Sequence, residues 1–231
     1  MGVILLEGGA EFGGQMAVPD QRAMVLAGGK DTPIRIIPAA AAPDNNHHQA
    51  GENGVSWFKR LGATNVAALP LIDSTSADDL GIAEALTKTR LIYLLGGFPR
   101  HLGQTLRGSR CWQAILSAYR TGAVIAGSSA GAMVLCDHYY DPSTSQVMDG
   151  LKLVNGMCIL PHHNAFGKDW VPRLRKNLPK LVLVGIDEET ACICVDSQES
   201  WQVHGKGKVT LYYKNHIKEL GPEQKFILPL Q

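Results

Sequence analysis

Short apolar runs alternate with longer amphipathic segments along the first half of the chain. Runs of four to eight apolar residues bounded by turn residues are typical of strands that are buried on both faces. We expect such strands at residues 3–6, 33–38, 66–72, 91–95 and 123–126. Their regular recurrence predicts a sheet whose strands are separated by helices.

The segments between these runs show helical spacing. We expect one helix at about 15–26 and a second after the polar loop that ends at His48, running to about Leu61. Further helices are expected from about Ala77 onward, at 111–119 and at 130–135, with a later one near 170–178. Ser76 or Thr75 is the expected N-cap of the helix from Ala77, because a hydroxyl there accepts a bond from a free backbone N–H. Alternating strands and helices imply right-handed crossovers and a parallel sheet with helices on both faces.

The pattern changes near the C-terminus. After a strand-like run within residues 181–191, the chain continues in short alternating segments up to Tyr213, with Asn215 and Gly221 as turn residues. Hairpins of this kind add antiparallel strands at one edge of a sheet. The predicted fold class is therefore α/β, with a mostly parallel sheet and antiparallel strands added near the C-terminus.

Composition and charge narrow the expected number of domains and the possible partners. The 231 residues, 45% of them hydrophobic, suit a single large α/β domain covering 1–231. A formal charge of +1 with interspersed acids and bases indicates neither nucleic acid nor an anionic membrane as a partner. Small, mostly uncharged ligands or short peptides stay open as partners, as does assembly into a homodimer.

The cysteines and the N-terminal residues indicate the cellular compartment in which we expect the protein. The five cysteines are an odd number and most lie in apolar runs, which is typical of reduced core residues in a cytoplasmic protein. No apolar run approaches the roughly 20 residues of a membrane span. The first residues lack a charged region ahead of an apolar one, so we expect no signal peptide.

The segment 122–135 changes its hydrophobic period in the middle. An apolar run ends in Gly127-x-Ser129-x-Gly131, and a helical pattern follows. This is the G-x-S-x-G pattern of a nucleophile elbow, a sharp strand-to-helix turn that exposes a serine hydroxyl. Small residues at such a junction are also common without any catalytic role, but the strand before and the helix after it favour the elbow. The N-terminus of the following helix would stabilise an oxyanion.

Other polar loops offer weaker signals. The glycine-rich loop 7–14 does not follow the dinucleotide fingerprint, and its two acids disfavour phosphate, so we expect it to line a pocket. His47 and His48 are adjacent on a loop, and no further ligand follows at metal-site spacing. Cys192-x-Cys194 likewise lacks further ligands. We expect no metal and no cofactor.

Four motifs together resemble a known family. They are Gly96-Gly97 after a strand, the elbow Gly127 to Ala132, Pro161-His162 after a strand, and the segment 185–191. In this order they are similar to the cyanophycinase and dipeptidase E family of serine peptidases, whose fold is like that of class I glutamine amidotransferases. The resemblance covers nearly the whole chain, and it implies a class I glutamine amidotransferase-like domain.

The resemblance implies a role for each matching residue. Ser129 corresponds to the nucleophile, His162 to the general base, and the backbone N–H groups of Gly97 and Ala130 to the oxyanion hole. His163 takes a position usually held by phenylalanine. The orienting acid is Asp141, which has about the spacing used by the dipeptidase branch, or otherwise Asp137. A serine needs such an imidazole to remove its proton, and the imidazole needs a partner that fixes its tautomer.

The chain departs from both branches after the glycine pair. Phe98-Pro99-Arg100 stands where relatives usually carry Asp or Asn with further polar residues, so neither branch's substrate preference carries over. Phe98, Arg100, Asn164 and Arg173 are candidate substrate-binding residues. Arg100 would hold a substrate carboxylate, although a solvent-facing arginine is an equal alternative. Lys168, Arg173 and Arg175 follow the histidine as basic residues do in the cyanophycinase branch, although solvated positions on a helix explain them equally well.

The predicted function is a serine-type hydrolase that cleaves amide bonds of small peptides or isopeptides. Two alternatives share part of the pattern. An esterase of the α/β-hydrolase type has the same elbow, but it usually carries its acid and histidine on later strands, whereas His162 follows Ser129 by only 33 positions. A catalytically silent binding protein could keep the same fold. Amidotransferase chemistry is disfavoured because the elbow carries serine where that class carries cysteine.

Overall fold

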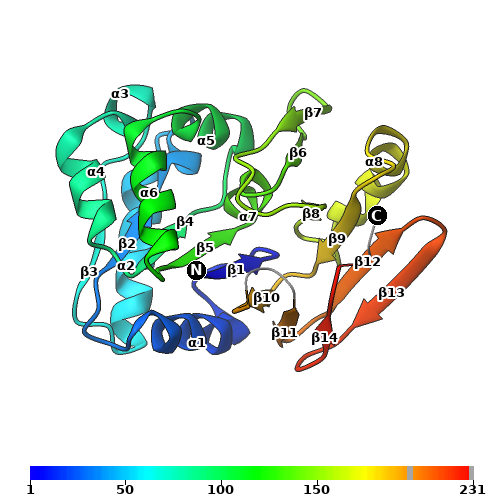
Figure 1. Ribbon diagram of the computed structural model, residues 1–231, viewed down its shortest axis with the longest axis horizontal. Helices are drawn as coiled ribbons and strands as arrows, with labels where there is room; N and C mark the ends of the chain where they lie inside the picture. The colour runs from blue at the N-terminus through cyan, green and yellow to red at the C-terminus, as the bar shows by residue number, and fades with distance from the viewer. Residues whose placement is uncertain (197–199, 229–231) are drawn as a thin grey trace.

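The computed structural model describes residues 1–196 and 200–228. Its centre is an eight-stranded sheet in the order β14-β11-β10-β1-β5-β4-β2-β3 (Figure 1). The five strands from β1 to β3 in this order run parallel, and β10, β11 and β14 are antiparallel to their neighbours. The strands are β1 Val3–Glu7, β2 Ile34–Ile37, β3 Val66–Ala68, β4 Leu91–Leu94, β5 Val124–Ser128, β10 Thr190–Cys194, β11 Trp201–Gly205 and β14 Lys225–Phe226.

A second sheet of four strands packs beside the first, in the order β13-β12-β9-β8. Its strands are β8 Met157–Leu160, β9 Val182–Ile186, β12 Val209–Tyr213 and β13 His216–Leu220, and a separate hairpin comprises β6 His138–Asp141 and β7 Gln146–Asp149. The expected antiparallel strands near the C-terminus are therefore confirmed. They divide between two sheets, however, and are not confined to one edge of a single sheet.

Helices cover both faces of the large sheet, as predicted (Figure 1). The α-helices are α1 Ala17–Ala27, α2 His47–Arg60, α3 Ser74–Ala77, α4 Leu80–Thr87, α5 Pro99–Leu106, α6 Arg110–Arg120, α7 Ala130–Val134 and α8 Val171–Asn177. Three short 3₁₀-helices are η1 Gly14–Met16, η2 Ala39–Ala41 and η3 Gly167–Trp170.

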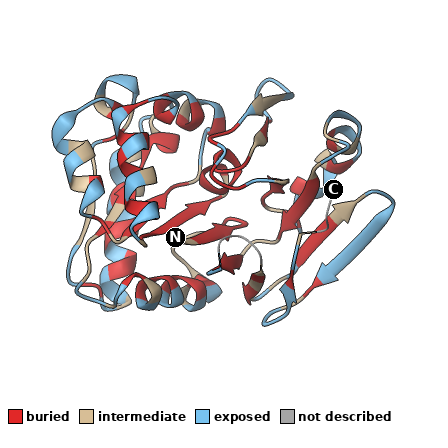
Figure 2. Cartoon of the chain, viewed as in Figure 1, coloured by how far each residue is buried: buried red, intermediate tan, exposed pale blue. Residues whose placement is uncertain are grey.

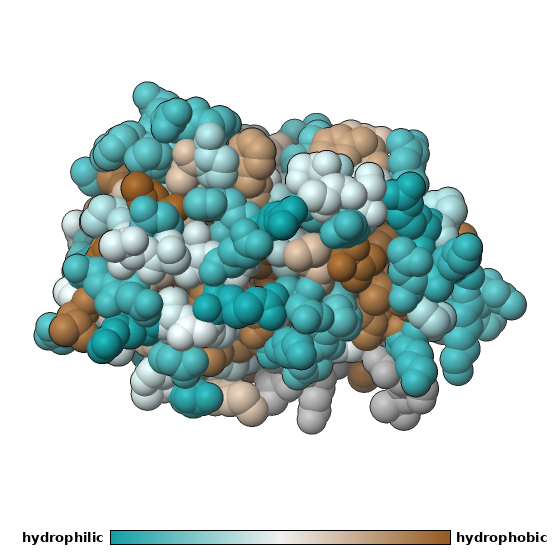
Figure 3. Space-filling view, turned by 90° about the horizontal axis from the view of Figure 1, so that it is seen from above, coloured by the Kyte–Doolittle hydropathy of each residue, from teal (hydrophilic) through white to brown (hydrophobic). Residues whose placement is uncertain are grey.

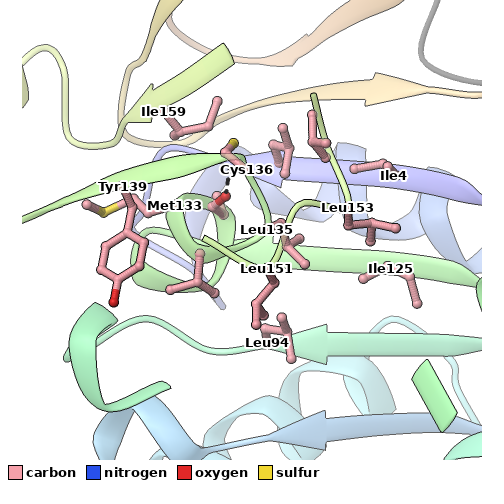
Figure 4. Packing of buried hydrophobic residues seen from close by; sticks show 14 of the residues in the cluster. Ile4, Leu94, Ile125, Met133, Leu135, Cys136, Tyr139, Leu151, Leu153 and Ile159 are labelled. Carbon is pink, nitrogen blue, oxygen red and sulfur yellow. Dashed lines mark hydrogen bonds between the residues drawn. The ribbon is translucent and has the colours of Figure 1, made fainter. Parts of the chain in front are cut away.

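Alternation along the central strands divides the core in two. Leu5 and Tyr93 point to the face covered by α1 and α2, while Ile4, Leu94 and Ile125 point to the face covered by α4 to α7. Successive side chains of a strand point to opposite faces, so each apolar run supplies both cores. Figure 4 shows the second core close up, and Figure 2 shows the buried strands beneath helices whose outer sides are exposed.

Some element boundaries differ from those predicted. The third strand ends at Ala68 and not at Ile72, because the run contains Pro70, which has no backbone N–H to donate to a sheet. Asp73, not Ser76 or Thr75, is the N-cap of α3, and its carboxylate accepts from the Ser76 N–H at 2.8 Å. The Ser76 hydroxyl completes a capping box.

Helix α5 was not predicted. It starts at Pro99, whose fixed φ and missing N–H suit the first turn of a helix. The preceding Phe98 donates its N–H to Ala40 O at 2.8 Å, which fixes the turn between β4 and this helix. The short, mixed sequence of α5 lacks a long apolar repeat, and tertiary packing stabilises it.

One broad face of the molecule is largely polar. On the face shown in Figure 3, hydrophobic residues form small brown areas among teal and white ones. All five cysteines are buried thiols outside any disulfide within the described residues, as expected from the apolar runs that contain most of them. Within the described residues, no helix combines the length and the apolar character that crossing a membrane requires.

Candidate active site

Ser129 occupies a strained turn between β5 and α7. Its φ of 49° and ψ of −111° are unfavourable for a residue with a side chain, as expected at a nucleophile elbow. The flanking glycines allow the close packing. A Cβ on Gly127 would lie 2.5 Å from the Gly131 carbonyl carbon, and one on Gly131 would lie 2.2 Å from Leu94 O. The predicted elbow is therefore present. Both flanking positions require glycine, because the neighbouring backbone leaves no space for a Cβ.

His162 brings its imidazole to this serine from the other sheet. It follows β8, and its Nε2 lies 3.0 Å from Ser129 Oγ. The His162 N–H donates to Gly8 O at 2.6 Å, which joins the segment after β8 to the loop after β1. Gly9 lies against the ring, since a Cβ there would be 2.2 Å from His162 Cε1. The glycine-rich loop thus leaves room for the histidine.

Glu188 is the acid that contacts His162. Its Oε1 lies 2.8 Å from His162 Nδ1, and it belongs to the turn between β9 and β10. A carboxylate accepts at this position, so Nδ1 carries the proton and Nε2 is free to accept from Ser129. The Asn164 side chain supports this turn by accepting from the Glu188 N–H at 2.9 Å.

The structure corrects the choice of acid made from the sequence. The carboxylate of Asp141 is buried and accepts from the hydroxyls of Ser143 and Thr144, both at 2.7 Å. Asp137 accepts from the Gly156 N–H at 2.8 Å. Both residues therefore stabilise turns around the hairpin β6–β7. Three acids that directly follow the buried strand β9 were the signal that could have indicated Glu188, because the ends of neighbouring strands meet at one edge.

His163 points away from the serine. Its Nε2 lies 2.9 Å from the Tyr212 hydroxyl, and its Nδ1 lies 3.4 Å from Asp187 Oδ1. Burial lowers the pKa of His163, and the nearby Asp187 only partly opposes this effect. Of the two adjacent histidines, the structure brings His162 to Ser129.

Of the two expected oxyanion donors, Ala130 directly follows the serine, and Gly97 follows Gly96, where a Cβ would lie 3.3 Å from Ser129 Cβ. Gly97 has a φ of 132°, which favours glycine, and a Cβ there would be 2.3 Å from Ala40 O. Ala130 is the first residue of α7, where N–H groups have no partner within the helix. Ser129 N–H itself donates to Glu7 O at 3.0 Å, so it is not available to a substrate oxygen.

Glu11 connects these two parts of the site. Its Oε2 accepts from the Ser128 hydroxyl at 2.9 Å, and its Oε1 accepts from the Gly96 N–H at 3.3 Å. Ser128 immediately precedes the elbow serine, and Gly96 immediately precedes Gly97. One carboxylate therefore ties the elbow to the glycine turn. Glu11 belongs to the glycine-rich loop that was expected to line a pocket, but no role was predicted for this residue itself.

Two further acids lie beneath the elbow. Glu7 accepts from the Tyr93 hydroxyl, and Asp20 accepts from Trp57 Nε1 at 2.7 Å. Burial, followed by the charge of Asp20, raises the pKa of Glu7 well above its ordinary value. Burial likewise raises the pKa of Asp20 to about 7. These carboxyls support the end of β1, whose Glu7 pairs in register with Ser128.

A cleft of about 470 Å³ opens beside the glycine turn. Gly96 and Gly97 line one end of it, together with Glu11 and Asp44. Asn46 at the N-cap of α2 lines it, as do Ala50, Asn53 and Arg60 of that helix, and Phe12 packs against the helix near Gly54. Phe12 packs against the rings of both Phe58 and Tyr93, with centroids at 6.4 and 5.3 Å, and these two rings also contact each other.

A row of aromatic side chains packs against the His162 ring. The exposed Phe166 stacks on His162 with ring centroids 4.9 Å apart, and Trp170 and Tyr140 continue the row. Arg173 donates to the Tyr140 hydroxyl at 3.2 Å and to Ser145 O at 3.3 Å. Arg173 and Asn164, both expected to bind substrate, therefore contact the protein itself.

The remaining predicted site residues are at the surface. Phe98 is 42% exposed, and Arg100 is also exposed, at the start of α5. Neither lines the cleft. Among the described residues, no group of three or more His, Cys, Asp or Glu side chains is arranged to hold a metal ion.

An elbow serine in contact with a histidine, at the carboxyl edge of a mostly parallel sheet, is the architecture of a serine hydrolase. The comparison with known families specifies the class further: residues 4–200 match the model of peptidase family S51, and the chain belongs to this family of serine peptidases. The resemblance inferred from four motifs is therefore confirmed.

Relatives agree with this assignment. The chain is 30% identical to a cyanophycinase of Geminocystis herdmanii (strain PCC 6308) over 93% of its own length and 84% of that protein. It is similar to the crystal structure of a peptidase from an acI-B1 Actinobacterium, with a TM-score of 0.86, 28% identity and coverage of 98% and 97% of the two chains. A putative peptidase E from Listeria monocytogenes EGD-e shares the fold, with a TM-score of 0.67 and 20% identity over 90% of this chain and 100% of that one.

Proposed function

We propose that this serine peptidase cleaves amide bonds of small peptides or isopeptides through the triad Ser129, His162 and Glu188. The observation that carries the proposal is the continuous chain of contacts, 3.0 Å from Ser129 Oγ to His162 Nε2 and 2.8 Å from His162 Nδ1 to Glu188 Oε1. This arrangement lets the imidazole take the serine proton while its tautomer stays fixed.

The reaction proceeds in two halves. Ser129 Oγ attacks the amide carbonyl as its proton passes to His162 Nε2, and the oxygen that becomes negative is stabilised by the N–H groups of Gly97 and Ala130. His162 then gives the proton to the leaving amine, which departs and leaves an acyl-serine ester. Water hydrolyses this ester by the same steps and restores the free serine. The reaction needs no metal or organic cofactor.

Labelling with a fluorophosphonate, followed by a peptide and isopeptide panel, tests the proposal. We expect the wild type to be labelled and to hydrolyse part of the panel, and Ser129→Ala to do neither, with a loss in turnover on the order of 10⁶. A Ser129→Ala variant that kept a tenth of the activity would overturn the assignment. A folded wild type that resisted labelling and cleaved no substrate would favour a silent binding protein instead.

A further inference from the structure

The cleft along α2 has one end at the glycine turn that holds an expected oxyanion donor, and it continues along the helix away from that turn. Gly97 lines the near end, and the loop carrying Asp44 and Asn46 borders it. Arg60 lines the far end, because α2 starts at His47 after this loop and ends at Arg60. The lining residues on the helix are spaced so that they follow one face of it.

The near end of the cleft accepts the acyl side of a substrate. The leaving amine must receive its proton from His162, which lies against Gly9 and Phe166 and does not line the cleft. Gly97, which would contact the carbonyl oxygen, does line it. A chain that runs from the scissile carbonyl into the cleft therefore belongs to the part that becomes the acyl-enzyme.

Charge differs between the two ends. Glu11 and Asp44 are acidic groups near Gly97, whereas Arg60 supplies a positive charge at the far end. The Arg60 guanidinium lies over the Trp57 ring, 5.4 Å from its centroid, and within the described part of the chain no carboxylate forms an ion pair with it. A ring contact of this kind orients the guanidinium and leaves its N–H donors available to an acceptor.

We infer that Arg60 binds a carboxylate of the substrate on its acyl side, several residues from the scissile bond. This inference rests on the proposed function and specifies its substrate class, namely acidic peptides or isopeptides longer than a dipeptide. From Asn46 to the level of Trp57, α2 rises about 16 Å at 1.5 Å per residue. An extended peptide covers that length with about five residues at 3.3 Å each.

Capped substrates test this assignment directly. The probes are fluorogenic peptide amides with one to six residues, which carry either an N-terminal succinyl group, bearing a carboxylate, or a neutral acetyl group. We expect KM to be about tenfold lower for the succinyl form at four to five residues, and the two caps to be equivalent at one residue, where the carboxylate cannot reach Arg60. An Arg60→Gln variant should lose the preference, because the amide has no charge for the carboxylate.

Lys59→Gln is the matched control, since it removes the same charge from the neighbouring position, which does not line the cleft. It should keep the succinyl preference. Binding of the corresponding uncleaved peptides to the Ser129→Ala variant gives a second readout that does not need turnover, and the succinyl form should again bind about tenfold more tightly. Equal binding of both caps at every length, or an equal loss of preference in Lys59→Gln, would overturn the inference.

The two proposals fail in different ways. Hydrolysis that depends on Ser129 but ignores the cap would overturn the role of Arg60 and leave the serine mechanism standing. Absence of hydrolysis together with a succinyl preference in binding would overturn the mechanism and keep the carboxylate site.

Discussion

Glu188 Oε1 lies 2.8 Å from His162 Nδ1, although the two residues come from turns after different strands of the four-stranded sheet. This contact determines which imidazole nitrogen carries the proton, and therefore whether the other nitrogen faces Ser129 as a base.

We expect Glu188→Gln to lower kcat by up to about 10⁴, because an amide can donate to Nδ1 and so favour the wrong tautomer. The measurement is steady-state turnover of the best panel substrate, with folding checked by circular dichroism. Glu189→Gln changes the next residue in the same way and should stay within a few-fold of wild type. If Asp141→Asn reduced turnover more than Glu188→Gln, the acid chosen from the sequence would be right after all.

Substitutions of the two neighbouring histidines should have clearly different effects. His162→Ala should abolish fluorophosphonate labelling, since nothing remains to take the serine proton. His163→Gln should be labelled at nearly the wild-type rate but unfold at a lower denaturant concentration, because it loses the buried contact with Tyr212. Both labelling rate and unfolding midpoint are measured for each variant. Labelling that survives in His162→Ala and disappears in His163→Gln would reverse the roles.

Glu11 should affect turnover more than substrate binding. Glu11→Ala removes the acceptor shared by Ser128 and Gly96, so the elbow and the Gly97 N–H can shift relative to each other. Loss of a single oxyanion donor costs about 10² to 10³ in kcat, and we expect a fall of at least tenfold. Ser128→Ala removes only the elbow side of the link and should cost less. A Glu11→Ala variant with kcat within twofold of wild type would show that the link is not needed.

The buried carboxyl of Asp20 should make stability depend on pH. Its pKa of about 7 in the folded protein lies above the roughly 3.9 of an unfolded chain, so the folded state holds the proton more strongly. Its contribution is fully present below about pH 4 and is lost as pH rises to about 7. Asp20→Asn stays neutral and keeps an acceptor for Trp57. It should therefore gain stability relative to wild type between pH 5 and pH 8, by up to a few kcal/mol.

Urea unfolding of both proteins at several pH values measures this difference. The exposed Asp169 provides the control, since Asp169→Asn should show no such trend. A difference between Asp20→Asn and wild type that stayed constant from pH 5 to pH 8 would mean that Asp20 does not retain its proton on folding.

Local sequence predicted much of the fold and the core of the site. Apolar runs gave the order of strands, and Gly127-x-Ser129-x-Gly131 indicated the elbow, because both signals depend on residues close together in the chain. Glu188 was missed, because its role arises only where the turn after β9 meets the turn after β8. Glu11 was missed for the same reason: its two partners, Ser128 and Gly96, lie more than 80 residues away in the sequence.

The division of the strands between two sheets has a further consequence. Ser129 directly follows β5 of the large sheet, whereas His162 and Glu188 follow β8 and β9 of the small one, and the His162 N–H bond to Gly8 O joins the two parts. Turnover is therefore expected to depend on the contact between the two sheets, and to be lost when that contact is lost. If the small sheet opened first in denaturant, turnover would vanish while the elbow remained folded, and inactivation would precede the loss of secondary structure.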